Sequence, residues 1–211
     1  MELIDGKLGA SALLRNEPVQ ARSAARLTAL LDAAAAAIDE LGYERLTTAM
    51  VAERAGASIG TVYRYFPDRI AVLQALATRN LEVVLKAVEH AIADRRSSAW
   101  RDVVLSSFDA YVAAFRTQRG FASLRGGDVL DLRPTSGRPM ANAHIAETLM
   151  NGLAARFGTN ASPETLFAFE NAIEVQDALI ARAFASTSRG DAAFLESGRA
   201  LVLSILAERL A

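Results

Sequence analysis

Apolar residues recur along most of this chain at spacings of three and four, the period of an α-helix that packs on one side. Strict alternation of apolar and polar residues, the pattern of a half-buried strand, is nearly absent. We therefore expect an all-helical protein. The expected helices span approximately residues 21–42, 47–56, 58–66, 68–96, 97–118, 138–157, 162–186 and 191–210.

Local signals mark where the short helices of the first third begin and end. Thr47, Ser58 and Asp68 each precede a helical stretch and are good N-caps, because their side-chain oxygens accept from free backbone N–H groups. Gly56 is placed to close the first short helix, and Pro67 stops the second, because the residue before a proline avoids the helical region. Two short helices joined by a tight turn have the shape of a helix-turn-helix.

The amino-acid composition excludes few classes of function, and the hydrophobic pattern is more informative. Lysine and arginine number 23 against 24 acidic residues, so the net charge of −1 indicates no partner. Without cysteine there is no disulfide, thiolate nucleophile or thiolate metal site. The N-terminus lacks the basic start of a signal peptide, and no apolar run is long enough to span a membrane. We expect a soluble cytoplasmic protein without metal or cofactor.

The stretch SIGTVYRYFPDR at residues 58–69 carries more polar and aromatic side chains than so short a helix needs for packing. Ile59, Val62 and Phe66 are expected to pack inward. Arg64 can form a forked contact with a guanine edge, and glycine and hydroxyl groups permit close approach to bases and phosphates. The residues expected to contact DNA are Thr47, Thr48, Ser58, Gly60, Thr61, Tyr63, Arg64, Tyr65 and Arg69.

The segment LTTAMVAERAGASIGTVYRYFPDRIAVLQAL, residues 46–76, resembles the DNA-binding domain of the TetR family of bacterial transcriptional regulators, and the resemblance covers roughly residues 22–76. The positions that carry the resemblance are Thr47, Ala52, Ala55, Gly56, Ser58, Gly60, Thr61, Tyr63, Tyr65, Phe66, Arg69 and Leu73. Arg69 stands where lysine is common in the family, which keeps the charge.

The resemblance implies a homodimeric repressor that binds a palindromic double-stranded DNA operator through a recognition helix at about 58–65. It also implies a C-terminal helical domain that binds a small effector and dimerises through the last two helices. We therefore expect a leader at residues 1–21, which we treat as flexible, a helix-turn-helix domain at 22–78, and an effector-binding and dimerisation domain at 79–211.

Aromatic residues outside the DNA-binding domain lie where the resemblance places the effector pocket. Each one taken alone fits an ordinary core position at least as well. Tyr111 is the most useful of them, since its hydroxyl could meet a mostly apolar ligand. The candidate effector-binding residues are Trp100, Phe108, Tyr111, Phe115, Phe121 and His144.

The last two helices, about 162–186 and 191–210, are apolar on more than one side. Such helices need partners on two fronts, and at a chain end this favours a two-fold interface between copies. Complete burial within one subunit is the alternative.

Two other function classes remain open. The run GASIG at residues 56–60 matches the G-x-S-x-G pattern of hydrolases, but that pattern requires a strand before the serine. His90 and His144 could contribute to a metal site only if distant segments converged. A helical enzyme, or a ligand-binding scaffold with a DNA module that no longer functions, are the alternatives to a DNA-binding regulator.

Overall fold

The structure is a computed structural model that describes residues 10–124 and 141–210, with side chains from Ala21 onward. This part of the chain is helical and contains no strand, which confirms the all-α prediction. None of its helices has the length and apolar content needed to cross a membrane. The elements are α1 (Ala10–Leu41), the 3-10 turn η1 (Tyr43–Arg45), α2 (Thr48–Arg54), α3 (Ile59–Tyr65), α4 (Arg69–Ala93), α5 (Trp100–Thr117), α6 (Ala141–Phe157), α7 (Pro163–Phe184) and α8 (Ala192–Leu210).

The predicted N-caps are in place at the starts of α2, α3 and α4. The Thr47 hydroxyl accepts from the backbone N–H of Met50 at 3.2 Å and begins α2. Ser58 does the same for α3, and a carboxylate oxygen of Asp68 accepts from the Ala71 N–H at 2.8 Å to begin α4. Satisfying these N–H groups locally lets helices as short as α2 and α3 start at fixed residues.

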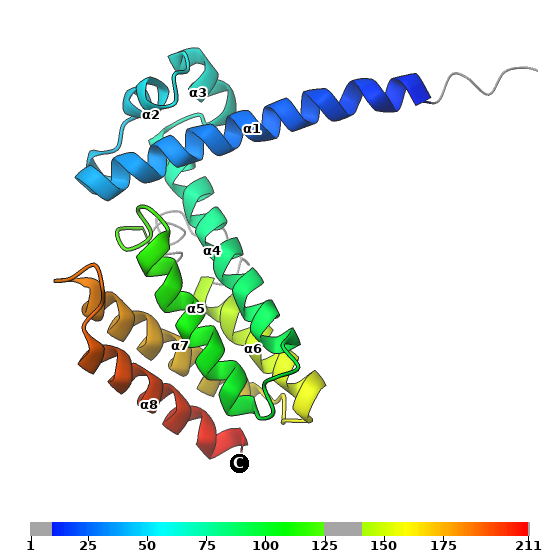
Figure 1. Ribbon diagram of the computed structural model, residues 1–211, viewed down its shortest axis with the longest axis vertical. Coiled ribbons are helices and arrows are strands. Elements are labelled where there is room, and N and C mark those ends of the chain that lie inside the picture. Colours follow the sequence, from blue (N-terminus) through cyan, green and yellow to red (C-terminus); the bar gives the residue numbers. More distant parts are fainter. Residues whose placement is uncertain (1–9, 125–140, 211) are drawn as a thin grey trace, which may run out of the picture.

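Helix α4 joins two lobes, each with its own core (Figure 1). The first core packs α1, α2 and α3 against the beginning of α4, which contributes residues as far as Ala77. The second core packs α5, α6, α7 and α8 against the later part of α4, from Val84 onward. One continuous helix therefore carries a small N-terminal domain on a larger helical body.

Helix α1 starts at Ala10, well before the start at Ala21 expected from the sequence. Part of the expected flexible leader therefore belongs to a long helix that projects away from the small domain (Figure 1). The sequence signal was weak because Pro18 disfavours a helix interior, although alanine and leucine around residues 10–14 favour one.

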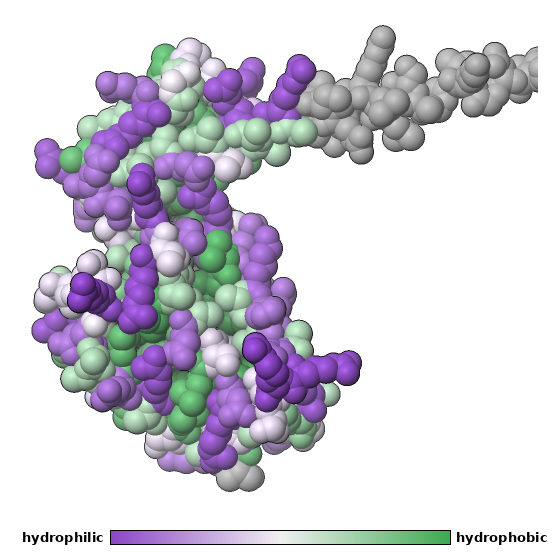
Figure 2. All heavy atoms as spheres, in the orientation of Figure 1, coloured by the Kyte–Doolittle hydropathy of each residue, from purple (hydrophilic) through white to green (hydrophobic). Residues whose placement is uncertain are grey.

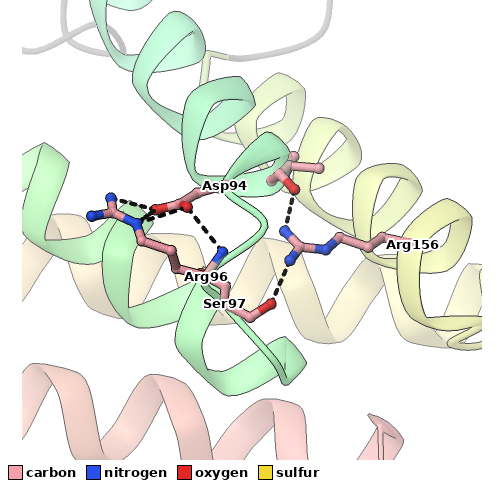
Figure 3. A network of polar contacts seen from close by, with 5 residues as sticks. Asp94, Arg96, Ser97 and Arg156 are labelled. Atoms are coloured by element: carbon pink, nitrogen blue, oxygen red, sulfur yellow. Dashed lines mark hydrogen bonds and ion pairs between the residues drawn. The ribbon is translucent and has the colours of Figure 1, made fainter.

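A polar clasp holds the far end of α4 (Figure 3). Arg156 of α6 donates to the backbone oxygens of Ile92, in the last turn of α4, and Ser97, before α5. Beside it, the Asp94 carboxylate accepts from the Arg96 guanidinium and backbone N–H, and these contacts lower the pKa of Asp94 to about 2. The turn from α4 to α5 is thereby fixed to α6.

Candidate DNA-binding surface and effector cavity

The turn between α2 and α3 has the geometry of a helix-turn-helix. The Ala57 N–H donates to the Ala52 oxygen at 2.9 Å, and Gly56 has φ of +57°, a conformation that favours glycine. Val51 of α2 and Val62 of α3 are both fully buried and fix the pair on the domain core. One side of α3 is thus committed to packing and the rest is available to a partner.

The outer side of α3 exposes two large apolar side chains. Tyr63 is 53% exposed and Ile59 is 43% exposed. The expectation that Ile59 packs inward was wrong, because the first turn of α3 lies beyond the edge of the core. Val62 is the one buried side chain within α3. Val62 and Phe66 do pack inward as expected.

Hydroxyl groups from both short helices meet on this surface. The Thr48 hydroxyl of α2 lies 3.4 Å from the Tyr63 hydroxyl of α3, and the Ser58 and Thr61 hydroxyls lie 3.0 Å apart. Exposed Gly60 has no side chain to shield the backbone there. Thr48 with Tyr63, and Ser58 with Thr61, are therefore brought together, while Thr47 and Arg64 are exposed as well.

Two of the predicted DNA-contact residues also hold the domain together. The Tyr65 hydroxyl lies 3.1 Å from the hydroxyl of Ser23 on α1. An Arg69 nitrogen donates to the backbone oxygen of Glu44 at 2.7 Å, which ties the start of α4 to η1. Sequence reasoning missed both contacts, because they join residues 42 and 25 positions apart in the chain.

A small cavity lies between α4, α5 and α6. Its volume is about 10 Å³, which is room for about one water molecule. Tyr111 and Phe121, two of the predicted residues, line it, and their rings pack edge to face at 5.8 Å. The other lining residues are Asn80, Leu81, Val84, Ala141, Asn142 and Ile145.

The other four predicted effector residues do not line this cavity. Phe115 packs against both aromatic lining residues, whereas Trp100 and Phe108 are buried in other parts of the core. His144 is exposed, although α6 itself borders the cavity, because its neighbour Ile145 occupies the inward-facing position.

The Tyr111 hydroxyl, expected to meet a ligand, donates to a carboxylate oxygen of Asp177 on α7 at 2.8 Å. This bond joins α5 to α7 within the body. A ligand that used the hydroxyl would have to share it or displace Asp177.

The interdomain segment, residues 118–124, connects the two lobes at a second place besides α4. Its Phe121 is buried in the core of the body, and its Leu124 is buried in the core of the small domain. Asn80 of α4, itself buried, donates to the Leu124 oxygen at 3.0 Å, and the Gly120 N–H donates to Asp39 of α1 at 3.1 Å. The sequence analysis named Phe121 as a pocket residue and did not predict this connection between the lobes. The one available signal was the pair of apolar residues Phe121 and Leu124 in a run flanked by glycines.

Helices α7 and α8 pack on each other, and each leaves one large apolar side chain exposed. Phe167 of α7 is 63% exposed and Leu201 of α8 is 47% exposed. Together with Ile59 and Tyr63 of α3, these are the exposed large hydrophobic residues of the described chain. Around Leu201, exposed positions Ala200 and Ser204 carry no charge.

Two family models match this chain. Residues 30–76 match the model for bacterial regulatory proteins of the tetR family, and residues 98–210 match the tetracyclin repressor-like C-terminal domain. A TetR-family transcriptional regulator from Streptomyces coelicolor is 32% identical in sequence. Its crystal structure superposes with a TM-score of 0.74, covering 88% of this chain and 99% of that one.

Curated relatives agree over shorter spans. An uncharacterized HTH-type transcriptional regulator, Mb2274c of Mycobacterium bovis, is 29% identical over 60% of this chain, and the match spans 62% of that relative's length. The HTH-type transcriptional repressor KstR of Rhodococcus jostii is 42% identical over 25% of each chain. Because the C-terminal model alone matches more than half of the chain, this protein belongs to the TetR family of transcriptional regulators.

Proposed function

We propose that this protein is a repressor that binds a palindromic operator as a homodimer in the cytoplasm and is released by a small, mostly apolar effector. The observation that carries the proposal is the outer face of α3, where apolar, hydroxyl and guanidinium groups stand exposed on a helix fixed by its opposite side. Membership of a family of regulators leaves no support for the helical-enzyme alternative.

In this proposal α3 lies in the major groove. Arg64 contacts a guanine edge, while Ile59 and the Thr61 methyl suit apolar contact with thymine. Thr47 and Ser58, at the starts of α2 and α3, present N–H groups and hydroxyls to phosphates.

The test is to select DNA fragments with the purified protein and sequence them. A palindromic motif with half-sites about 34–36 Å apart, or somewhat more, is expected. Arg64→Ala should then weaken binding by about 1–3 kcal/mol and relax the preference at one position in each half-site. A selected motif that stays unchanged in this variant would place base recognition elsewhere.

The exposed apolar side chains of α7 and α8, Phe167 and Leu201, support the dimer. Burying a large apolar side chain contributes about 1.5–3 kcal/mol, so covering the exposed parts of Phe167 and Leu201 in both subunits would contribute roughly 3–7 kcal/mol. Two-fold symmetry brings the same helices of two copies together as a four-helix bundle.

Leu201→Glu should shift the protein from dimer to monomer in analytical ultracentrifugation and weaken operator binding in parallel. Ala113→Glu, which places the same charge at an exposed position of α5, is the matched control and should do neither. A variant Leu201→Glu that remains dimeric would assign the interface to another face.

For the effector, we infer that the cavity beside Tyr111 and Phe121 opens when ligand binds, because its present volume admits no ligand larger than water. Moving Phe121 would pull on the interdomain segment, which contacts α1 through Gly120 and α4 through Leu124. A ligand could in this way alter the position of the small domain. Linkage then requires the ligand to bind less tightly to the DNA-bound protein.

The ligand can be sought by thermal shift with apolar and aromatic compounds and then titrated against the protein–operator complex. The coupling should amount to about 1–3 kcal/mol. Ala141→Val, which narrows the cavity, should blunt the release of DNA without changing ligand-free operator binding. Ala154→Val on the same helix, away from the cavity lining, is the control. Equal responses in both variants would place the effector elsewhere.

A further inference from the structure

A groove of about 720 Å³ lies between α1 and the end of α3. It lies where α1 leaves the small domain, and strongly hydrophilic residues gather at that place (Figure 2). Its lining consists of Arg22, Ser23, Ala25, Arg26, Ala29, Arg64 and Tyr65.

The described lining is positively charged. Among the described residues it holds three arginines and no carboxylate, and no acidic residue occurs in the sequence from Ala21 to Leu31. Elsewhere in the small domain, Arg54 pairs with Glu40 and Arg79 pairs with Asp32. Within the described residues, by contrast, no ion pair engages the arginines of the groove.

The groove is held in shape by the contact between α1 and α3. The Tyr65 and Ser23 hydroxyls, 3.1 Å apart, join the two walls, and the Arg64 guanidinium lies 5.4 Å from the centre of the Tyr65 ring. Ala25 and Ala29 are too small to fill the space between the walls. A partner can therefore enter the space between α1 and α3 and contact the arginine side chains that line it.

The chemistry and position of the groove fit a phosphodiester backbone. Guanidinium groups bind phosphate oxygens with paired hydrogen bonds, and desolvating uncompensated arginines favours an anionic partner. Arg22 and Arg26 lie one helical turn apart, about 6 Å along α1, so they can meet neighbouring phosphates. Arg64 belongs both to this groove and to the proposed base-reading face, which makes the two surfaces continuous.

We propose that Arg22 and Arg26 of α1 bind the phosphate backbone of the DNA strand that borders the α3 contact. The inference rests on the proposed operator binding, and it adds α1 to the DNA interface. The two arginines would strengthen binding to all sequences and leave base preference to α3.

The test is the double variant Arg22→Gln, Arg26→Gln, titrated with the selected operator over a range of salt concentrations. Each lost phosphate contact flattens the plot of log affinity against log salt by about 0.9, so a dimer that loses four should flatten by roughly 3 to 4. Affinity near 0.15 M salt should fall by about tenfold or more, and each single variant should show about half of the double variant's change in slope. The selected motif should not change.

The matched control is Arg95→Gln, Arg101→Gln, which removes the same charge from two exposed positions at the far end of the body. It should keep the wild-type slope. Circular dichroism should show unaltered melting for both double variants, since all four side chains are exposed.

The outcomes separate this inference from the proposed function. A wild-type protein that selects no DNA motif would overturn the proposed function itself. A wild-type protein that selects a motif, beside an Arg22/Arg26 variant with unchanged slope, would overturn only the role of α1. Binding of poly-glutamate to the wild type and to the Arg22/Arg26 variant is measured as well. If the variant keeps the wild-type salt slope with DNA but loses binding to poly-glutamate, the groove would be assigned to an acidic protein partner instead.

Discussion

Gly120 offers the sharpest test of how the interdomain segment contacts α1. Its φ of +70° lies in the left-handed region, and a Cβ atom there would stand 2.8 Å from the backbone oxygen of Ala35 and 3.3 Å from Ile38. Because the obstructing atom belongs to the backbone of α1, a rotamer change cannot relieve the clash. Gly120→Ala should therefore force the segment and α1 apart.

The expected cost has two parts. A non-glycine residue in the left-handed region costs about 1–2 kcal/mol. Displacing packed atoms to make room for an extra methyl group costs about 1–3 kcal/mol more, so the free energy of unfolding should fall by roughly 2–5 kcal/mol in total. Loss of the hydrogen bond from Gly120 to Asp39 would move the result towards the upper end.

Gly158 separates the two parts. It has φ of +71° but nothing within 4 Å of the Cβ position, so Gly158→Ala should cost only the conformational 1–2 kcal/mol. Urea denaturation of both variants at one protein concentration would give the difference, which is the steric cost. Equal losses of stability would refute the described contact between the interdomain segment and α1.

Three further substitutions test individual contacts. Arg96→Ala should raise the pKa of Asp94 from about 2 towards its ordinary 3.8 in an NMR titration. In the wild type, the stabilisation by this pair is present above about pH 4 and should be lost as the pH falls towards 2; the variant should lack this loss. Tyr111→Phe should lower the free energy of unfolding in urea by about 1–3 kcal/mol, because the hydrogen bond to Asp177 is lost; no change would make that bond unimportant. Ser162→Ala should cost about 1 kcal/mol in thermal unfolding by removing the cap of α7, and an unshifted melting temperature would argue against the cap.

The sequence predicted those features that depend on neighbouring residues. Thr47, Ser58 and Asp68 begin their helices as expected, because a cap bonds to an N–H only two or three positions away. The two short helices and their turn followed from the same local signals. The helix-turn-helix could therefore be located from the sequence alone.

Features that depend on distant residues were not predictable in this way. The exposure of Ile59 depends on where the domain core ends, and the engagement of the Tyr111 hydroxyl depends on α7, 66 positions away. His144 was expected to reach the effector cavity. It does lie on a helix that borders the cavity, α6, but on the exposed side of that helix. In each case periodicity gives the helix, while tertiary packing decides which of its faces is covered.

The burial of Leu124 in the small domain has a consequence for engineering hybrid regulators. A chimaera that joins the first 78 residues to the body of another family member would omit Leu124, a fully buried part of the donor's core. The grafted domain would then carry a hole lined by apolar side chains unless the new body supplied a residue of similar volume. The modular unit for such grafting is therefore discontinuous, since it comprises α1 to the first half of α4 together with residues 118–124.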